Sequence, residues 1–256
     1  MKVVHSWRGY WLGGNDCVAQ PAGGNLQTLA RVITLQDTRR FFMRKNWFAL
    51  CAGLIFGTCQ IPISIAADFI VTTDPAKTCS AIELRGEINV GDYNQFKIAL
   101  GQAKRLAPLK RLYLNSGGGN ILTTFAITEY VRNTAADIET IVPPGGFCNS
   151  ACVILLTVGS RHNVSADAVV QVHQAFDTKT GERDPVITKE MGHYLALNGL
   201  PPDVMWTMQS LKSDEVLAVT PSNAKRLGFA SFNFYGGINP PATPKCSWDG
   251  QILKGG

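Results

Sequence analysis

The chain has 256 residues, of which 45% are hydrophobic, and it carries a formal net charge of +5. This length and apolar content are enough for one full core, or for one domain with a tail. The positive charge lies in the first 67 residues, which hold 7 basic and 2 acidic side chains, and the remainder from Asp68 balances at 17 of each. A neutral domain has no basic block to neutralise phosphates, so nucleic acid is excluded as the expected partner.

A targeting segment is predicted near the N-terminus. The basic run Arg39–Lys45 precedes a charge-free stretch, Trp47–Ala67, that ends in small residues. Basic, apolar and small segments in this order are typical of a secretory signal peptide, so residues 43–67 are expected to be removed on export. The alternative is an uncleaved anchor in the inner membrane, but Gln60 and Pro62 interrupt the apolar run.

Residues 1–42 have the pattern of neither a signal peptide nor a domain, because they mix Gly, Asn and Gln with scattered aromatic residues. Met43, followed by two basic residues, is a natural start for a signal peptide. We therefore expect translation to begin at Met43, with a disordered leader as the alternative. The folded domain is expected over residues 68–234, followed by an irregular tail over 235–256 that is rich in Gly and Pro.

Strands and helices are predicted to alternate along the domain. Alternating and apolar runs favour strands, whereas apolar residues spaced three and four apart favour helices. The expected strands are 68–72, 80–84, 111–114, 138–142, 168–172 and 229–234, and the expected helices are 92–106, 121–133, 151–158, 185–198, 202–211 and 221–228. Asp92 is expected to cap the first helix, and Thr220 the last. This alternation predicts an α/β fold with a mainly parallel sheet and right-handed crossovers.

Four cysteines follow the proposed cleavage site, and an even number allows three pairings in an oxidising compartment. Cys148 and Cys152 are four residues apart, and a bond across a single turn is geometrically awkward. The expected disulfide therefore joins Cys79 to Cys246 and ties the tail to the first strands. A zinc site is the rival interpretation, but a lone CxxxC pair supports it poorly. No metal or other cofactor is expected.

The segment Gly146–Cys152 places Ser150 between a strand with its turn and an apolar helix. N–H groups at a helix start have no partner inside the helix, so they stabilise an anion beside the serine. The glycine run Gly117–Gly119 lets a backbone approach a ligand closely, and His173 ends a later strand. Acyl transfer needs such a hydroxyl, a base and N–H donors. The plainer alternatives are a helix-capping serine and a core histidine.

Three of these motifs resemble the Clp protease/crotonase superfamily, in particular the exported Clp-protease-like proteins of bacteria. They are the strand and turn at 114–119, the Cys-Asn-Ser-Ala-Cys turn at 148–152 and the strand that ends at His173. The resemblance covers roughly residues 80–234 and implies a fold of repeated strand-strand-helix units. It also implies that Ser150 is the nucleophile, that His173 is the general base, and that the N–H groups of Gly119 and Ala151 form the oxyanion hole.

The same resemblance implies an acid just before the last strand-helix unit of the domain. Asp214 fits this position, and Glu215 is the alternative because the register can slip by one residue. Asp177 is nearer to His173 in sequence, but it lies in an expected loop. The family's first turn usually has a proline where this chain has Gly117, a minor departure.

Three functions of different class remain open. The first is a serine peptidase exported to the bacterial periplasm, which acts on a peptide or protein without metal or nucleotide. The second is an inactive relative that binds peptides or an envelope partner in the same cleft. The third is a crotonase-type enzyme of acyl-CoA, against which export argues because CoA thioesters are cytoplasmic. Assembly into a homo-oligomer is left open, and membrane contact is expected only through an uncleaved signal segment.

Overall fold

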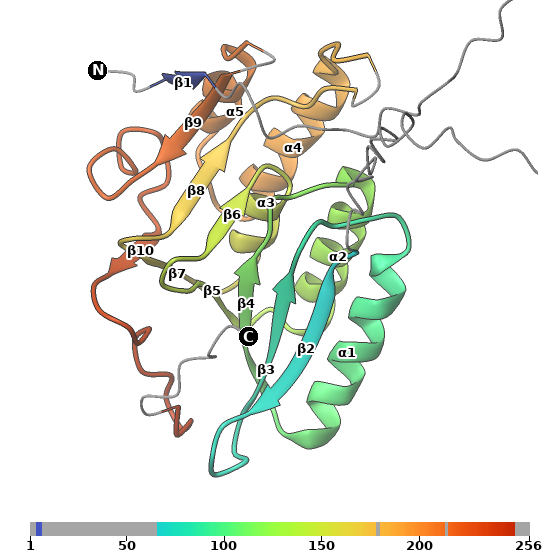
Figure 1. Ribbon diagram of the computed structural model, residues 1–256, viewed down its shortest axis with the longest axis vertical. Helices are drawn as coiled ribbons and strands as arrows, with labels where there is room; N and C mark the ends of the chain where they lie inside the picture. The colour runs from blue at the N-terminus through green and yellow to red at the C-terminus, as the bar shows by residue number, and fades with distance from the viewer. Residues whose placement is uncertain (1–3, 7–65, 178–179, 213–214, 249–256) are drawn as a thin grey trace, which may run out of the picture. The chain divides into compact units, whose positions relative to one another are not determined.

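The computed structural model describes residues 4–6, 66–177, 180–212 and 215–248 (Figure 1). These residues belong to one compact unit of the chain, formed by Met1–Trp11 and Ile63–Gly256. The expected leader and signal segment lie outside the described residues, apart from a short strand at Val4–Ser6 and the last two alanines before Asp68.

The larger sheet has six strands within the described residues, in the order β10-β7-β5-β4-β3-β2. All neighbours are parallel except β2 and β3, which form an antiparallel pair. A mainly parallel sheet with helical crossovers confirms the predicted α/β class. The strands are β2 (Asp68–Thr73), β3 (Ser80–Arg85), β4 (Leu109–Asn115), β5 (Glu139–Val142), β7 (Arg161–Ser165) and β10 (Phe232–Tyr235).

The smaller sheet, also counted over the described residues, has four strands in the order β1-β9-β8-β6. Its strands are β1 (Val4–Ser6), β6 (Phe147–Asn149), β8 (Val169–Val172) and β9 (Glu215–Val219). Strands β6 and β8 are parallel, whereas β9 runs antiparallel to both β8 and β1. An isolated bridge between Ser116 and Cys148 joins the two sheets directly after β4.

Alternate residues of β4 face two different apolar clusters, because successive side chains of a strand point to opposite faces. Leu112 and Leu114 belong to the main core, whereas Tyr113 packs with Ala81, Ile141 and Trp248.

Helix α1 packs on β2 and β3, α2 contacts α1 and α3, and α4 contacts α3 and α5. The helices are α1 (Asp92–Leu106), α2 (Ile121–Thr134), α3 (Cys152–Leu156), α4 (Pro185–Leu197) and α5 (Asp203–Gln209). No helix in the described part of the chain is long and apolar enough to cross a membrane.

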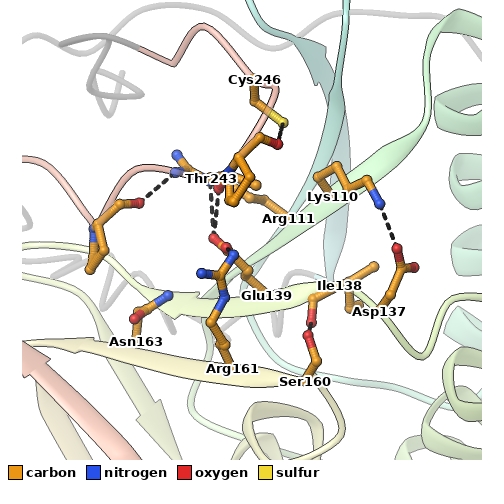
Figure 2. A network of polar contacts seen from close by, with 12 residues as sticks. Lys110, Arg111, Asp137, Ile138, Glu139, Ser160, Arg161, Asn163, Thr243 and Cys246 are labelled. Carbon is orange, nitrogen blue, oxygen red and sulfur yellow. Dashed lines mark hydrogen bonds and ion pairs between the residues drawn. The ribbon is translucent and has the colours of Figure 1, made fainter.

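A buried arginine, Arg111, holds the tail after β10 on the face of the larger sheet where Tyr113 packs (Figure 2). The Arg111 side chain donates from Nε to Thr243 Oγ1 at 2.7 Å and from Nη2 to the Pro241 carbonyl at 2.8 Å. Its charge is balanced by Glu139 at 3.5 Å, which also pairs with Arg161. A buried charge is costly unless it is paired and hydrogen-bonded, so these contacts fix the path of the tail.

Several sequence-based expectations about local structure are wrong. Strands β6, β7 and β9 were not predicted, and residues 221–228 form consecutive turns instead of a helix. Asp92 does not cap α1, because its carboxylate accepts the N–H groups of Asn89 and Ala67 and no side chain caps the helix. Helix α3 has five residues, Cys152–Leu156, and not the eight expected.

Candidate active site

Ser150 and His173 leave the same edge of the smaller sheet. Strands β6 and β8 are parallel and their last pair is Asn149 with Gln171. Ser150 follows Asn149 directly, and His173 lies two residues after Gln171. The carboxyl ends of parallel strands meet at one edge, so the pairing itself brings the serine and the histidine together. The Ser150 N–H donates to the Gln171 carbonyl at 2.9 Å and ties the two ends to each other.

Ser150 adopts a left-handed backbone conformation, with φ of 56°. This conformation costs a residue with a side chain about 1–3 kcal/mol, and it recurs where a strand turns sharply into a helix and exposes a nucleophile. The Val153 N–H donates back to the Ser150 carbonyl at 3.0 Å and closes the turn. Because α3 has only five residues, we expect its dipole to be small, so individual N–H groups must stabilise an anion here.

The glycine turn after β4 packs directly on the serine turn. The Asn149 N–H donates to the Ser116 carbonyl at 3.0 Å, and the Gly118 N–H donates to Ser116 Oγ at 3.1 Å. Gly118 has φ of 98°, and a Cβ there would lie 2.6 Å from the Asn149 carbonyl oxygen and 2.9 Å from the Ala151 nitrogen. Only glycine fits this position, both for its backbone conformation and for its space.

Two backbone N–H groups at this contact, those of Gly119 and Ala151, donate no hydrogen bond within the described residues. Ile88 donates to the Gly118 carbonyl at 2.7 Å and accepts the Asn120 N–H at 2.6 Å, a pattern that turns the N–H of Gly119 away from Ile88. The structure therefore offers N–H donors at the two positions that the resemblance assigns to the oxyanion hole.

The His173 ring is buried and held by a backbone carbonyl. Its Nδ1–H donates to the Gln174 oxygen at 2.6 Å, which leaves the lone pair of the neutral ring on Nε2. Burial disfavours the charged ring and lowers the pKa of His173 below its ordinary value of 6.5, and this hydrogen bond opposes the shift only in part. The sequence carries no signal for this carbonyl, because any residue can supply it.

A cleft of about 400 Å³ contains Ser150, Ala151, His173 and Gly119 in its walls. The other wall residues include apolar side chains that sequence analysis did not assign to a site, among them Ile88, Ile121, Ile187 and Met191. Ile121, Ile187 and Met191 lie on helices, where apolar spacing indicates only a buried face, so pattern alone could not distinguish cleft-lining from core residues. The sequence-predicted serine, histidine and oxyanion residues thus converge on one cavity.

Residues 77–191, which include these four site residues, match the family model described as Clp protease. Over this matched segment the chain is similar to the Clp protease family. Two solved structures are similar to the chain. One is the ClpP protease catalytic domain from Plasmodium falciparum, with 20% identity, a TM-score of 0.48, and coverage of 66% of this chain and 89% of that chain. The other is a ClpP1 mutant from Listeria monocytogenes, with 14% identity, a TM-score of 0.47, and coverage of 61% and 91%. Comparison with curated proteins gives no match.

The acid that the resemblance implies is not identified by the geometry, because Asp214 lies outside the described residues. Val172 pairs with Leu217, so extending that antiparallel register by one residue places Val216 opposite His173. Glu215, the alternative, accepts the Lys212 N–H at 2.9 Å and is not among the residues that line the cleft. Asp177 does line the cleft, and its Oδ1 accepts the Thr180 N–H at 3.0 Å.

All four cysteines among the described residues of the chain form disulfides. Cys79 and Cys246 are joined as expected, with 5.5 Å between their Cα atoms. The expectation that Cys148 and Cys152 pair poorly is wrong, since they are also joined, with 5.2 Å between Cα atoms. The left-handed turn at Ser150 explains the error, because Cys148 lies in strand β6 instead of sharing a helical turn with Cys152. No thiol of these four is free to bind zinc.

Proposed function

We propose that this chain is an exported serine peptidase of the Clp-protease type. The observation that carries the proposal is the convergence of Ser150, His173 and the N–H groups of Gly119 and Ala151 on one cleft. Nucleophile, base and oxyanion donors are the three parts that acyl transfer requires. A domain that only binds peptides has no need of a strained serine beside a buried histidine.

His173 acts as the general base in this proposal. Its Nδ1–H is engaged by Gln174, so Nε2 carries the lone pair that takes the proton from Ser150 Oγ. The lowered pKa of His173 keeps the ring neutral at neutral pH, as a base must be.

The proposed reaction has two steps, acylation of Ser150 and hydrolysis of the resulting ester. Ser150 Oγ attacks the substrate carbonyl as its proton moves to His173, and the tetrahedral oxyanion accepts the N–H groups of Gly119 and Ala151. His173 returns that proton to the leaving amine, the C–N bond breaks and an ester on Ser150 remains. Water then attacks this ester as its proton moves to His173, and His173 gives the proton to Ser150 Oγ as the acyl C–O bond breaks, which releases the acid product and regenerates the serine and the neutral histidine.

A peptide or protein is the substrate class that suits the cleft. Its volume of about 400 Å³ is in the usual range for sites that take a small ligand or a few residues of a chain. Ile121, Ile187 and Met191 provide an apolar wall for a side chain next to the scissile bond.

Export is supported by the cysteine chemistry. Disulfides form and persist in oxidising compartments, and both disulfides of the described residues are buried or partly buried structural links. Together with the basic, apolar and small segments over residues 39–67, this favours a mature protein in the bacterial periplasm.

Hydrolysis by the purified mature protein tests the proposal. A set of short peptide esters with apolar residues before the scissile bond should be cleaved by the native enzyme and not by Ser150→Ala. Equal, residual hydrolysis by both proteins would favour the inactive, peptide-binding relative. Hydrolysis of acyl-CoA but not of peptide esters would favour the crotonase-type enzyme.

A further inference from the structure

The Cys148–Cys152 disulfide encloses Ser150 in a short loop, because the two cysteines have a sequence separation of 4. The bond joins Cys148, the middle residue of β6, to Cys152, the first residue of α3, and Ser150 lies midway between the two cysteines. Ala151, whose N–H faces the proposed oxyanion, lies inside the same loop. The two cysteines do not line the cleft themselves, but Ser150 and Ala151 between them do.

Stabilisation of the whole fold is a weak explanation for this bond. A disulfide restricts the unfolded chain more as its loop grows longer, so a sequence separation of 4 gives far less than the separation of 167 between Cys79 and Cys246. Both sulfur-bearing side chains are fully buried, with 0% exposed surface, among residues of the main core. The short bond therefore acts mainly on local geometry.

The local geometry in question is strained. Ser150 holds φ of 56°, a conformation that persists only where the surroundings enforce it. Hydrogen bonds fix the start of the turn, since the Asn149 N–H donates to Ser116 and the Ser150 N–H to Gln171. The end of the turn is held by α3, which is too short to be stable by itself.

We propose that the Cys148–Cys152 disulfide is a positioning device that holds Ser150 and the Ala151 N–H in their reactive arrangement, so that the enzyme is competent only after oxidation. This inference rests on the proposed serine-peptidase function. Oxidation removes two electrons and two protons from the two thiols and reduces a partner disulfide oxidant to a dithiol. Because the sulfurs are buried, the bond is made during folding and is protected from reductants afterwards.

The consequence is that export and activity are coupled. In a reducing compartment the thiols stay apart, the turn at Ser150 relaxes, and the Ala151 N–H leaves the oxyanion position. The enzyme is thereby inactive until it reaches the oxidising compartment.

The test compares two double variants of the full mature protein. Cys148→Ala with Cys152→Ala removes the short bond, and Cys79→Ala with Cys246→Ala is the matched control that removes the long one away from the cleft. The rate of Ser150 labelling by a fluorophosphonate, and kcat and KM for a peptide ester, are measured beside thermal unfolding. If the alanine pair does not fold, Cys148→Val with Cys152→Ala refills part of the lost volume and takes its place.

We expect the short-bond variant to label and turn over about 10²-fold more slowly, which is the size of the loss of one oxyanion donor, with KM little changed. The control should unfold at a lower temperature and label at the native rate. A folded short-bond variant that labels within about threefold of the native rate would overturn the inference.

Failure of the proposed function is separable from failure of this inference. If native protein and Ser150→Ala are equally unlabelled, the peptidase proposal fails, and amide hydrogen exchange at Ala151 still reports on the turn. Faster exchange at Ala151 in the short-bond variant than in native protein supports the positioning role, and equal exchange rejects it.

Discussion

Gly118 lies so close to Ser150 that a Cβ on the glycine would stand 2.8 Å from the Cβ of the serine. The two turns are therefore in backbone contact, and the position of the Ala151 N–H depends on the absence of a side chain at Gly118. The serine turn depends on this contact, because the helix that follows it, α3, has only five residues, whereas the glycine turn leads into the longer helix α2.

Gly118→Ala should lower the rate of peptide-ester hydrolysis by about 10²-fold, because the serine turn must move and one oxyanion donor is displaced. Gly145→Ala is the matched control, since that glycine also has a positive φ, 66°, but nothing lies within 4 Å of an added Cβ. Both variants carry the cost of the backbone conformation, and only the first crowds the site. Equal rates for the two variants would show that the contact has no catalytic role.

The value of kcat/KM for peptide-ester hydrolysis should not change around neutral pH and should fall only below pH 6.5. Burial lowers the pKa of His173 from 6.5, so the neutral base persists to lower pH than for an exposed ring. The check is the acid limb of kcat/KM, and a limb centred above 6.5 would contradict the assignment.

Thermal unfolding at each pH is the control, because buried His162 and His173 both have a lowered pKa. The unfolded state then gains protons first and stability declines below pH 6.5.

Asp214→Asn should cost less than either Ser150→Ala or His173→Ala. The Gln174 carbonyl already holds Nδ1 of the histidine, so we expect a loss of roughly tenfold or less, not the ~10⁴-fold loss of a triad whose acid alone orients the ring. Kinetics of Asp214→Asn, Asp177→Asn and Glu215→Gln compare the three candidates. A loss for Asp177→Asn that exceeds the loss for Asp214→Asn would move the acid role to Asp177, which lines the cleft.

The mature protein should begin at Ala67 or Asp68. The Ala67 nitrogen lies 3.3 Å from Asp92 Oδ2, which also accepts the Asn89 N–H at 2.7 Å, so a chain that begins at Ala67 keeps this contact with a loop of the cleft and one that begins at Asp68 loses it. N-terminal sequencing of periplasmic protein checks this, and an intact Trp47–Ala67 segment in the membrane fraction would indicate an anchor instead.

Asp92→Asn should destabilise the fold by about 1.5–3 kcal/mol, because a buried charged acceptor is lost. Asp203→Asn, in the first turn of the exposed start of α5, should stay within about 0.5 kcal/mol and serves as the control. The measurement is denaturant unfolding of the mature protein. Equal midpoints for the two variants would show that the contact of Asp92 with Ala67 and Asn89 contributes nothing.

The sequence predicted the parts of the fold that depend on local pattern. Helix α1 ends at Leu106 as expected from its apolar spacing, and α4 begins with Asp184 accepting the Ile187 N–H and with Pro185 in its first turn. Strand β7 was missed because its residues, Arg161–Ser165, are mostly polar, although the sheet buries four of the five. Only pairing with β5 and β10 makes it a strand, and such pairing is not a local property.

The site was predictable to the extent that it follows from motifs. Ser150, His173, Gly119 and Ala151 were named from three short segments, and they share one cleft. The Cys148–Cys152 bond was rejected on the assumption of a regular helical turn, and the positive φ of Ser150 makes that assumption fail. A backbone conformation that only the neighbouring turn enforces cannot be read from the residue type of a serine.

The most direct test of the peptidase proposal is the site of reaction with a fluorophosphonate, mapped by mass spectrometry on the purified mature protein. We predict one adduct per chain, on Ser150, with no labelling of Ser150→Ala and a strong loss in His173→Ala, while both variants unfold near the native temperature. The two variants and their combination should be about equally inactive, because serine and histidine act as a unit. An adduct on another serine, or no adduct on a folded native protein, would contradict the proposal.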